Sequence, residues 1–317
     1  MLVRPAVREY RTWVLDSRRW DGYRPRSGDV VVTTYPKCGT TWMQRIVNLL
    51  IFQTAEVRPV SAISPWIDMR VGPPIGDALA GLETQTHRRA VKAHLPFDGL
   101  PLHDDVKYIH VARDGRDACL SFHNHGTGFK PQMFERLDAA GLADETLARP
   151  FPRIPADPAE YFGKWLRTGA IAGQTDGYQF LSYFEFHKTY WIERHRPNLL
   201  MVNFADMSAD LEGEMRRVAD FLDIEVPERL WPDLIEAAGF QAMKQQGAGL
   251  MPQVVQLFEG GAERFFNKGQ NGRWRNLFTA EDVALYHAKQ DAVLAPACIA
   301  WLAGGRRVAG DPRESAP

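Results

Sequence analysis

Four short runs of apolar, mostly β-branched residues stand out along the chain. They read DVVVTTY (29–35), RAVKAH (89–94), KYIHVAR (107–113) and LLMVNF (199–204). Short apolar runs without regular polar alternation are typical of strands that are buried on both faces of a parallel sheet. The pattern therefore predicts four buried parallel strands.

Helical spacing of apolar residues follows these runs. TTWMQRIVNLLIF (40–52) and SADLEGEMRRVADFLD (208–223) both show it, and Ser208 is a candidate N-cap of the second helix. Strands that alternate with helices favour an α/β fold with helices on both faces of the sheet. No break in composition and no internal repeat divides the chain. We therefore predict one three-layer domain over residues 1–317, with a central parallel sheet flanked by helices.

Three stretches interrupt the alternation and are expected to form long loops or short irregular helices. They are residues 58–88, which are rich in Pro and Gly, residues 126–158 and residues 245–264. Loops of that length are uncommon unless they are functional or mobile. The last residues, from about 304 to 317, are predicted to form a disordered tail.

Composition narrows the classes of function. Hydrophobic residues make up 45% and charged residues 24% of the chain, as in soluble globular enzymes. The formal net charge of −1 lacks the basic excess of a nucleic-acid-binding protein. The three cysteines are odd in number and far apart, which indicates neither a disulfide framework nor a metal cluster and favours a reducing compartment.

The sequence gives no sign of a membrane segment. Its first residues carry charges throughout, and the apolar run at 46–52 is far shorter than the ~20 residues that cross a bilayer. A cytoplasmic protein without membrane or nucleic-acid partners is predicted.

Candidate chemistry begins directly after the first predicted strand, in YPKCGTTW (35–42). Gly39 lets the backbone approach a ligand, and a helix that starts near Thr40 points unpaired N–H groups at it. Lys37 adds a positive charge, and Thr40 and Thr41 add hydroxyl donors. This predicts a P-loop-like anion site, although the triphosphate loop has a second Gly before its Lys and Ser or Thr after it. The alternative is a surface turn with a solvated Lys37.

The segment VKYIHVARDGRDACLSFHNH (106–125) carries a second candidate anion site. Arg113 stands where the predicted strand ends, and Ser121 follows two helical turns later, so both side chains can bind one phosphate. Alternatively, Arg113 pairs with Asp114 or Asp117 and is purely structural.

A third segment, FFNKGQNGRWRNLFT (265–279), contains Lys268 beside Gly269 and alone would be a solvated turn. In this order, YPKCGTTW, ARDGRDACLS and FFNKGQNGRWRNLFT resemble the three signature regions of the cytosolic-type sulfotransferases. The resemblance spans about residues 16–279, and three motifs in order are more specific than any one of them. It implies a single α/β domain that transfers a sulfuryl group from 3′-phosphoadenosine 5′-phosphosulfate (PAPS) to an acceptor hydroxyl or amine.

The resemblance also implies which residues bind this co-substrate. The loop after the first strand holds the 5′-phosphosulfate, aromatic residues pack on the adenine, and the two later motifs bind the 3′-phosphate. The residues are Lys37, Cys38, Gly39, Thr40 and Thr41 for the phosphosulfate; Trp42, Phe204, Phe240 and Met243 around the purine; and Arg113, Ser121, Asn267, Lys268 and Gly269 for the 3′-phosphate.

Four positions depart from the family pattern. Cys38 replaces the usual Ser, which leaves the backbone N–H available. Asn267 replaces the usual Arg, so one charge contact to the 3′-phosphate is missing. Phe204 replaces a common Tyr, and Gly239 replaces a common Ser. We expect a recognisable pocket with lower affinity for the donor than is typical.

The catalytic base is expected where the second predicted strand ends, in VKAHLP (91–96). Ligands bind at the carboxyl ends of parallel strands, and in the family Lys-X-His-Leu-Pro carries the base, which Lys92 and His94 match. His94 is expected to take the acceptor proton, with a rate that falls in acid as His94 becomes protonated. Lys37 is expected to stabilise the leaving phosphate. No cluster of carboxylates indicates a required metal.

The other histidines are expected to be structural or remain open. His110 should be buried in its strand, and His187 and His195 should lie on the surface or in the core of a helical segment. His125, four residues after Ser121, either faces the acceptor or caps its helix.

The acceptor is the least determined part of the site. Trp66, Phe97, Phe122 and Phe129 either line an acceptor pocket, which is usually mostly apolar, or belong to the core. A phenol, alcohol or amine of modest size is predicted, and a saccharide or lipid stays open.

Two other functions compete with sulfuryl transfer. A P-loop kinase needs a Lys after the second Gly and an Asp for Mg²⁺, and neither is evident. A non-catalytic nucleotide-binding module would keep the loops without using a base.

Because RNLFTAEDVA (275–284) keeps only Thr279 of the family's dimerisation pattern, a monomer or weak homodimer is predicted.

Overall fold

The computed structural model describes residues 1–315. Its strands are β1 Leu2–Arg4, β2 Val30–Thr34, β3 Ala90–Ala93, β4 Leu102–His103, β5 Lys107–Ala112 and β6 Leu199–Asn203. Its helices up to the last strand are α1 Thr40–Phe52, α2 Val60–Ile63, α3 Ile75–Glu83, α4 Gly115–Gly126, α5 Pro131–Leu142, α6 Pro158–Arg167 and α7 Tyr183–Ile192.

The remaining helices follow β6. They are α8 Phe204–Ala209, α9 Leu211–Phe221, α10 Trp231–Ala238, α11 Phe240–Gln245, α12 Gly247–Leu250, α13 Val254–Leu257, α14 Gly261–Phe265, α15 Ala280–Val293, α16 Pro296–Gly304 and α17 Arg306–Ala309. Short 3-10 helices are η1 Ser17–Gly22, η2 Phe97–Gly99, η3 Glu228–Leu230 and η4 Arg273–Asn276.

The four predicted strands form one parallel sheet in the order β3-β2-β5-β6. In its register, Val32 of β2 lies opposite Lys92 of β3 and Ile109 of β5. A separate antiparallel pair, β1 and β4, was not predicted, because its strands span only two or three residues and carry no pattern. The prediction of a parallel α/β sheet is confirmed.

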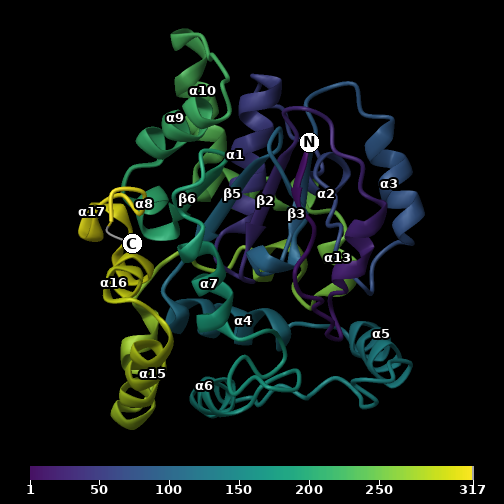
Figure 1. Cartoon of the computed structure of the whole chain (residues 1–317), viewed down its shortest axis with the longest axis vertical. Helices are drawn as coiled ribbons and strands as arrows, with labels where there is room; N and C mark the ends of the chain where they lie inside the picture. Colours follow the sequence, from purple (N-terminus) through teal and green to yellow (C-terminus); the bar gives the residue numbers. More distant parts are fainter. Residues whose placement is uncertain (316–317) are drawn as a thin grey trace.

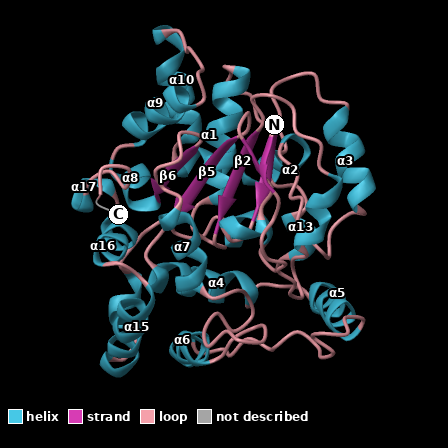
Figure 2. Cartoon of the chain, in the orientation of Figure 1, coloured by secondary structure: helices cyan, strands magenta, loops and turns pink. Residues whose placement is uncertain are grey.

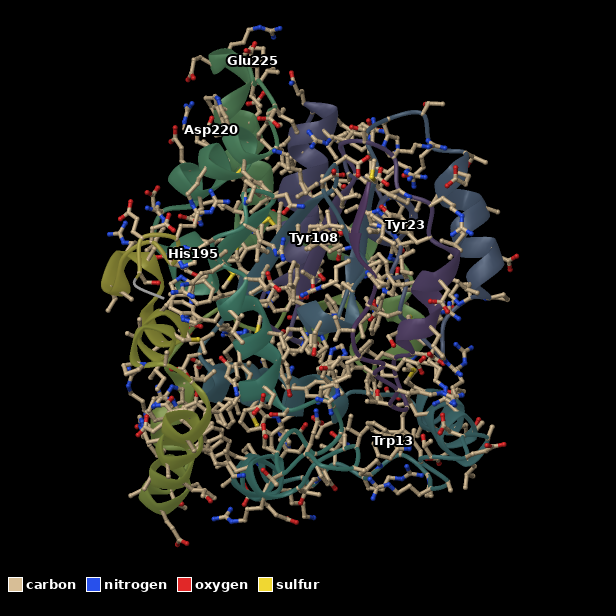
Figure 3. All side chains as sticks on the ribbon, in the orientation of Figure 1. Trp13, Tyr23, Tyr108, His195, Asp220 and Glu225 are labelled. Atoms are coloured by element: carbon tan, nitrogen blue, oxygen red, sulfur yellow. The ribbon has the colours of Figure 1, made fainter. Side chains whose placement is uncertain are left out.

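Helices cover both faces of the sheet (Figures 1 and 2). Val30 and Val32 pack with residues of α1, α9 and α10, including Met43 and Val218. Val31 points the other way, into a larger aromatic core supplied partly by α6 and α7. Figure 3 shows Tyr108 of this core near the middle of the molecule. The alternation of neighbouring β2 side chains between two cores produces the three-layer arrangement.

The helix predicted at 40–52 has the bounds of α1, but the helix predicted at 208–223 starts differently. Asn203 caps an earlier helix, α8, by accepting from the Ala205 N–H at 2.8 Å. Ser208 lies inside α8 and donates to the Phe204 carbonyl at 2.8 Å, so it is not an N-cap. Asp210 caps α9 instead.

The three irregular stretches were predicted to form long loops or short irregular helices, and they contain short helices. Residues 58–88 contain α2 and α3, residues 126–158 contain α5, and residues 245–264 contain α12, α13 and most of α14.

The tail differs from its prediction. Residues 306–309 are helical, and the Arg313 guanidinium donates to the Leu199 carbonyl at 2.6 Å, which ties the segment to the start of β6. Backbone capping by Asp206, which accepts from the Arg306 N–H at 2.8 Å, also orders this segment. Residues 316–317 of the predicted tail lie outside the described residues. The single domain over 1–317 stays a prediction.

Membrane insertion through a helix finds no support within residues 1–315, where every helix is too short or too polar to cross a bilayer.

Candidate active site

A cavity of about 310 Å³ opens at the carboxyl ends of the parallel strands. The strand order reverses direction between β2 and β5, and such switch points leave a crevice where ligands bind. Each strand is followed by a lining residue: His94, Arg113 and Phe204 come directly after β3, β5 and β6, and Lys37 comes three residues after the end of β2. The strand arrows in Figure 2 point toward this end, where α4 begins.

The cavity collects nearly all the residues that the sequence predicts for the site. Those that line it are Lys37, Gly39, Thr40, Thr41, Trp42, Lys92, His94, Arg113, Ser121, Phe204, Phe240, Met243, Asn267, Lys268 and Gly269. Cys38 is the exception: its side chain packs in the core, and its N–H donates to the Tyr35 carbonyl at 3.3 Å. The predicted donation from the Cys38 N–H is therefore not available in this conformation.

The loop between β2 and α1 is held in a tight, strained shape. Lys37 has φ 69°, which is uncommon for a residue other than glycine. Gly39 has φ 109°, and a Cβ there would lie 3.2 Å from the Phe204 ring. Glycine is thus required by both the backbone angle and the close approach. Because α1 begins at Thr40, its first N–H groups lack partners within the helix.

Lys37 is a half-buried ammonium group, and within residues 1–315 no carboxylate forms an ion pair with it. Burial, followed by the charges of Lys92 and Arg113, lowers the pKa of Lys37 to about 7. Its Nζ lies 3.3 Å from Nδ1 of His125 and 4.7 Å from the centre of the Phe265 ring. A cation enclosed by like charges and aromatic rings is poised to attract an anion.

The geometry of His94 fixes where its proton sits. Nδ1 lies 2.6 Å from the Thr34 carbonyl oxygen, which can only accept, so Nδ1 carries the hydrogen. Nε2 is then left with a free lone pair. Burial, followed by the charge of Lys92, holds the pKa of His94 well below its usual value, so the imidazole stays neutral near pH 7.

Asp68 and Trp66 both contact His94 and fix its position. The buried Asp68 carboxylate accepts from the His94 backbone N–H at 3.0 Å and from Trp66 Nε1 at 2.7 Å. The Trp66 ring meets the His94 ring edge to face, with centres 4.8 Å apart, and the Lys92 ammonium lies 4.1 Å from the Trp66 ring centre. Burial lowers the pKa of Lys92 to about 8.

Within residues 1–315, Arg113 forms no ion pair with Asp114 or Asp117, so the pairing in the alternative interpretation is absent. Its guanidinium donates from Nη2 to the Gln270 carbonyl and from Nε to Asn271 Oδ1, both at 2.8 Å. Asp114 instead forms an ion pair with Arg116 at 2.6 Å. The guanidinium therefore lies between the strand end and the late loop, facing the cavity.

Aromatic rings form one wall beside these cations. The Trp42 and Phe204 rings meet edge to face, with centres 5.3 Å apart, and the Arg113 guanidinium lies 4.2 Å from the Phe204 centre. Gly269 has φ 60°, and a Cβ there would lie 2.6 Å from the Phe240 ring. Flat rings next to fixed cations suit a purine with phosphates.

Another part of the cavity lining is apolar. Trp66, Phe122 and Phe129 line it, whereas Phe97 does not, because its ring packs on Tyr108 and Tyr190 in the core. The further lining residues there are Val14, Met69, Met133, Phe151, Phe180, Leu257 and Phe258.

His125 lies between the cationic and apolar parts. It is inside α4, whose C-cap residue is Thr127, and its ring contacts Phe129 and Phe258 at centre distances of 5.2 and 4.5 Å. Of the two interpretations left open, the structure supports the one in which His125 faces the cavity.

The other histidines predicted to be structural lie away from the cavity. His110 and His187 are buried between β5 and α7, and His195 is exposed. Within residues 1–315, no group of three or more His, Cys, Asp or Glu side chains could hold a metal ion.

Among charged side chains, sequence reasoning missed three that line the cavity or support it: Asp68, Asp117 and Arg273. Asp68 stands in an irregular stretch, and its buried role depends on contacts that no local pattern encodes. Asp117 accepts from the Gly272 N–H at 2.8 Å, and Arg273 follows directly and lines the cavity. In the sequence, the only feature that could have indicated Arg273 is its position between Gly272 and Trp274 in the third motif.

Comparison with known proteins agrees with this geometry. A family model described as the sulfotransferase domain matches residues 27–294. A glycolipid sulfotransferase of Mycobacterium tuberculosis (strain ATCC 25177 / H37Ra) is 33% identical over 309 residues, which cover 94% of this chain and 94% of that protein. Sulfotransferase 1B1 of Mus musculus is 24% identical, covering 87% and 86%. The structure of retinol dehydratase with androsterone and the inactive cofactor PAP shares the fold, with a TM-score of 0.68 and 23% identity over 88% of this chain and 84% of that chain.

Proposed function

This chain belongs to the sulfotransferase domain family and is a sulfotransferase, and from that membership we propose that PAPS is its donor and a small hydroxyl or amine compound its acceptor. The observation that carries the proposal is the position of the His94 lone pair and the Lys37 ammonium in one cavity between a cationic, aromatic part and an apolar part. The retinol dehydratase structure was determined with PAP. We infer that the same nucleotide, adenosine 3′,5′-bisphosphate, fits here.

The residues present suit that nucleotide. Lys37 and the N–H groups at the start of α1 would hold the 5′-phosphosulfate, because helix N-termini favour anions. Trp42, Phe204, Phe240 and Met243 would enclose the adenine. Arg113, Ser121, Lys268 and Gly269 would bind the 3′-phosphate, with Asn267 beside them.

In the proposed reaction, His94 removes the acceptor proton while the acceptor oxygen or nitrogen bonds to sulfur. Nε2 takes the proton because Nδ1 is already bonded to Thr34. The bond between sulfur and the phosphate oxygen breaks, and Lys37 stabilises the charge that grows on that oxygen. Burial, followed by the charge of Lys92, keeps His94 neutral, and Lys92, held over Trp66, adds positive charge to the same part of the cavity.

The apolar part of the cavity favours acceptors whose reacting group is carried on an apolar skeleton. Phenols and alcohols of that kind are the proposed class, and the name of the mycobacterial relative extends it to glycolipids. A cytoplasmic location and a monomeric or weakly dimeric state are parts of the same proposal.

Calorimetric titration with adenosine 3′,5′-bisphosphate and with 5′-AMP tests the donor assignment. Because charge-assisted contacts contribute ~1.5–3 kcal/mol each, the bisphosphate should bind more than about tenfold better. Equal affinities would contradict the 3′-phosphate assignment. A screen of phenols, alcohols, amines and glycolipids with ³⁵S-labelled PAPS then tests transfer, with His94→Ala as the inactive control. Transfer of a phosphoryl group from ATP under the same conditions would favour a kinase instead.

A further inference from the structure

Three cationic side chains line the cavity near the end of β5. Arg113 comes from the strand end, and Lys268 and Arg273 come from the late loop. Asp117, from the first turn of α4, is the carboxylate among these lining residues. Three positive charges against one negative charge leave an excess of about two, which matches the −1.5 to −2 charge of a phosphate monoester near pH 7.

Arg273 differs from most arginines of the chain in having no partner. Within residues 1–315, its guanidinium forms neither a hydrogen bond nor an ion pair. Arg116, a near neighbour, is by contrast bound to Asp114 at 2.6 Å. An arginine that is half-buried without a partner keeps five N–H donors available for a ligand.

The backbone around Arg273 is fixed relative to Arg113. Gly272, with φ 79°, donates its N–H to Asp117 Oδ2 at 2.8 Å, and the Gln270 carbonyl accepts from Arg113 at 2.8 Å. Burial is the main effect that lowers the pKa of Arg113, and the positive charge of Arg273 adds to it, so the two guanidinium groups are close enough to repel each other. An anion between them would remove this repulsion.

We propose that Arg273 is a binding residue for the 3′-phosphate of the donor, supplying the charge that Asn267 lacks. The proposal rests on the proposed function, since it assumes a donor with a 3′-phosphate. Arg273 stands six residues after Asn267 but lines the same cavity, because the glycines at 269 and 272 turn the loop back toward α4. Its planar fork can bind two phosphate oxygens at once, which a lysine cannot do.

The test compares Arg273→Gln with Arg275→Gln. Both substitutions remove one charge from the same short helix, η4, but the Arg275 guanidinium lies over the Trp274 ring at 5.2 Å and Arg275 does not line the cavity. Calorimetric titration of each variant and the wild type with adenosine 3′,5′-bisphosphate and with 5′-AMP gives four affinity changes. Thermal unfolding of each variant checks that the fold is retained.

We expect Arg273→Gln to weaken binding of the bisphosphate about tenfold or more, the usual effect of a lost charge-assisted contact, and to leave 5′-AMP binding within about twofold. Arg275→Gln should change neither. Arg273→Lys should recover part of the loss. A bisphosphate preference that survives Arg273→Gln would overturn the inference while leaving the proposed donor intact. A wild-type protein that binds both nucleotides equally would overturn the donor assignment and the inference with it.

Discussion

His94 and Lys37, the two side chains expected to act in the reaction, have different chemical roles. His94 is locked by the Thr34 carbonyl into the tautomer with a free Nε2, whereas Lys37 lies in the loop before α1 and contacts the neutral His125 ring and the Phe265 ring. The first can only accept a proton, and the second can only attract negative charge. Substitutions at these positions should therefore affect different steps.

His94→Ala should lower the rate of sulfuryl transfer by ~10²–10⁴ and leave donor affinity nearly unchanged. Lys37→Ala should weaken donor binding and also slow transfer, because the charge that it stabilises grows in the transition state. Donor titration and single-turnover transfer measured on both variants check the division. A His94→Ala enzyme with near wild-type turnover would exclude His94 as the base, and His125 would be tested next.

The rate of transfer should fall at a lower pH than it would if the base were a histidine with an ordinary pKa. Since burial and Lys92 hold the pKa of His94 well below its usual value, the donor-free enzyme keeps its base down to a lower pH than expected from the sequence. The sequence-based expectation of a fall in acid stays a prediction, and the structure moves the expected fall to lower pH than that of an ordinary histidine.

Donor binding should be accompanied by proton uptake near neutral pH. The pKa of Lys37 is about 7 in the donor-free enzyme, so the side chain is largely neutral at pH 8. A bound anion raises this pKa, and Lys37 should take up close to one proton at pH 8 and less at pH 6. Calorimetry in two buffers of different ionisation enthalpy measures the uptake. Lys37→Met should abolish most of it, and Lys92→Met, whose residue has a pKa of about 8, should remove the smaller remainder.

At the scale of elements, a buried histidine pair joins β5 to α7. His110 Nδ1 lies 3.2 Å from the Thr33 carbonyl oxygen and must carry the hydrogen, so its Nε2 accepts from His187 Nδ1 at 3.0 Å. The second nitrogen of His187 is buried and has no hydrogen-bond partner among residues 1–315. Both rings are therefore neutral in the folded protein, and neither can gain a proton without losing a contact or placing a charge in the core.

This pair should make the stability depend on pH. Burial lowers the pKa of His187 to about 3, below that of the unfolded chain, near 6.5. The unfolded state therefore binds the proton first, and the free energy of unfolding should fall as pH drops from about 6.5 toward 3, by up to ~1.4 kcal/mol per pH unit. Urea unfolding at pH 7, 6 and 5 measures this slope. His187→Phe should reduce the slope, whatever its effect on stability at pH 7; an unchanged slope would assign the effect to other groups.

The elements that the sequence predicted well are those whose burial is uniform. The runs at 29–35 and 107–113 are buried on both faces, so their composition alone indicates parallel strands, and they match β2 and β5 within one residue at each end. The start of α9 was misplaced because Asn203 and Asp210 both cap helices, and a single-sequence pattern does not say which of several polar residues accepts the N–H.

The site was predictable to the extent that it is local in sequence. The loop from Lys37 to Trp42 is one turn between a strand and a helix, and its residue types alone indicate an anion site. Asp68 and Arg273 were missed because each acquires its position through long-range contacts: Asp68 with His94, and the loop before Arg273 with Asp117.

At the scale of the whole molecule, the segment that the family uses for dimerisation is occupied with internal contacts. Thr279 caps α15 by accepting from the Asp282 N–H at 3.1 Å, and Val283 and Leu285 pack against the main core. Trp274 also packs against this core and lies under the Arg116 guanidinium at 3.9 Å. The large apolar side chain that remains exposed in this segment is Leu277, at 42%.

We therefore predict that residues 275–284 form no stable dimer, because one exposed leucine falls far short of the ~1,200–2,000 Å² that stable interfaces bury. Multi-angle light scattering between micromolar and high-micromolar protein should give a mass near the 35.9 kDa of one chain throughout. Leu277→Asp serves as the matched variant and should leave that mass unchanged. A dimer that persists on dilution and dissociates in Leu277→Asp would show that residues 275–284 associate despite their departures from the family pattern. A dimer that Leu277→Asp leaves intact would place the interface on another surface.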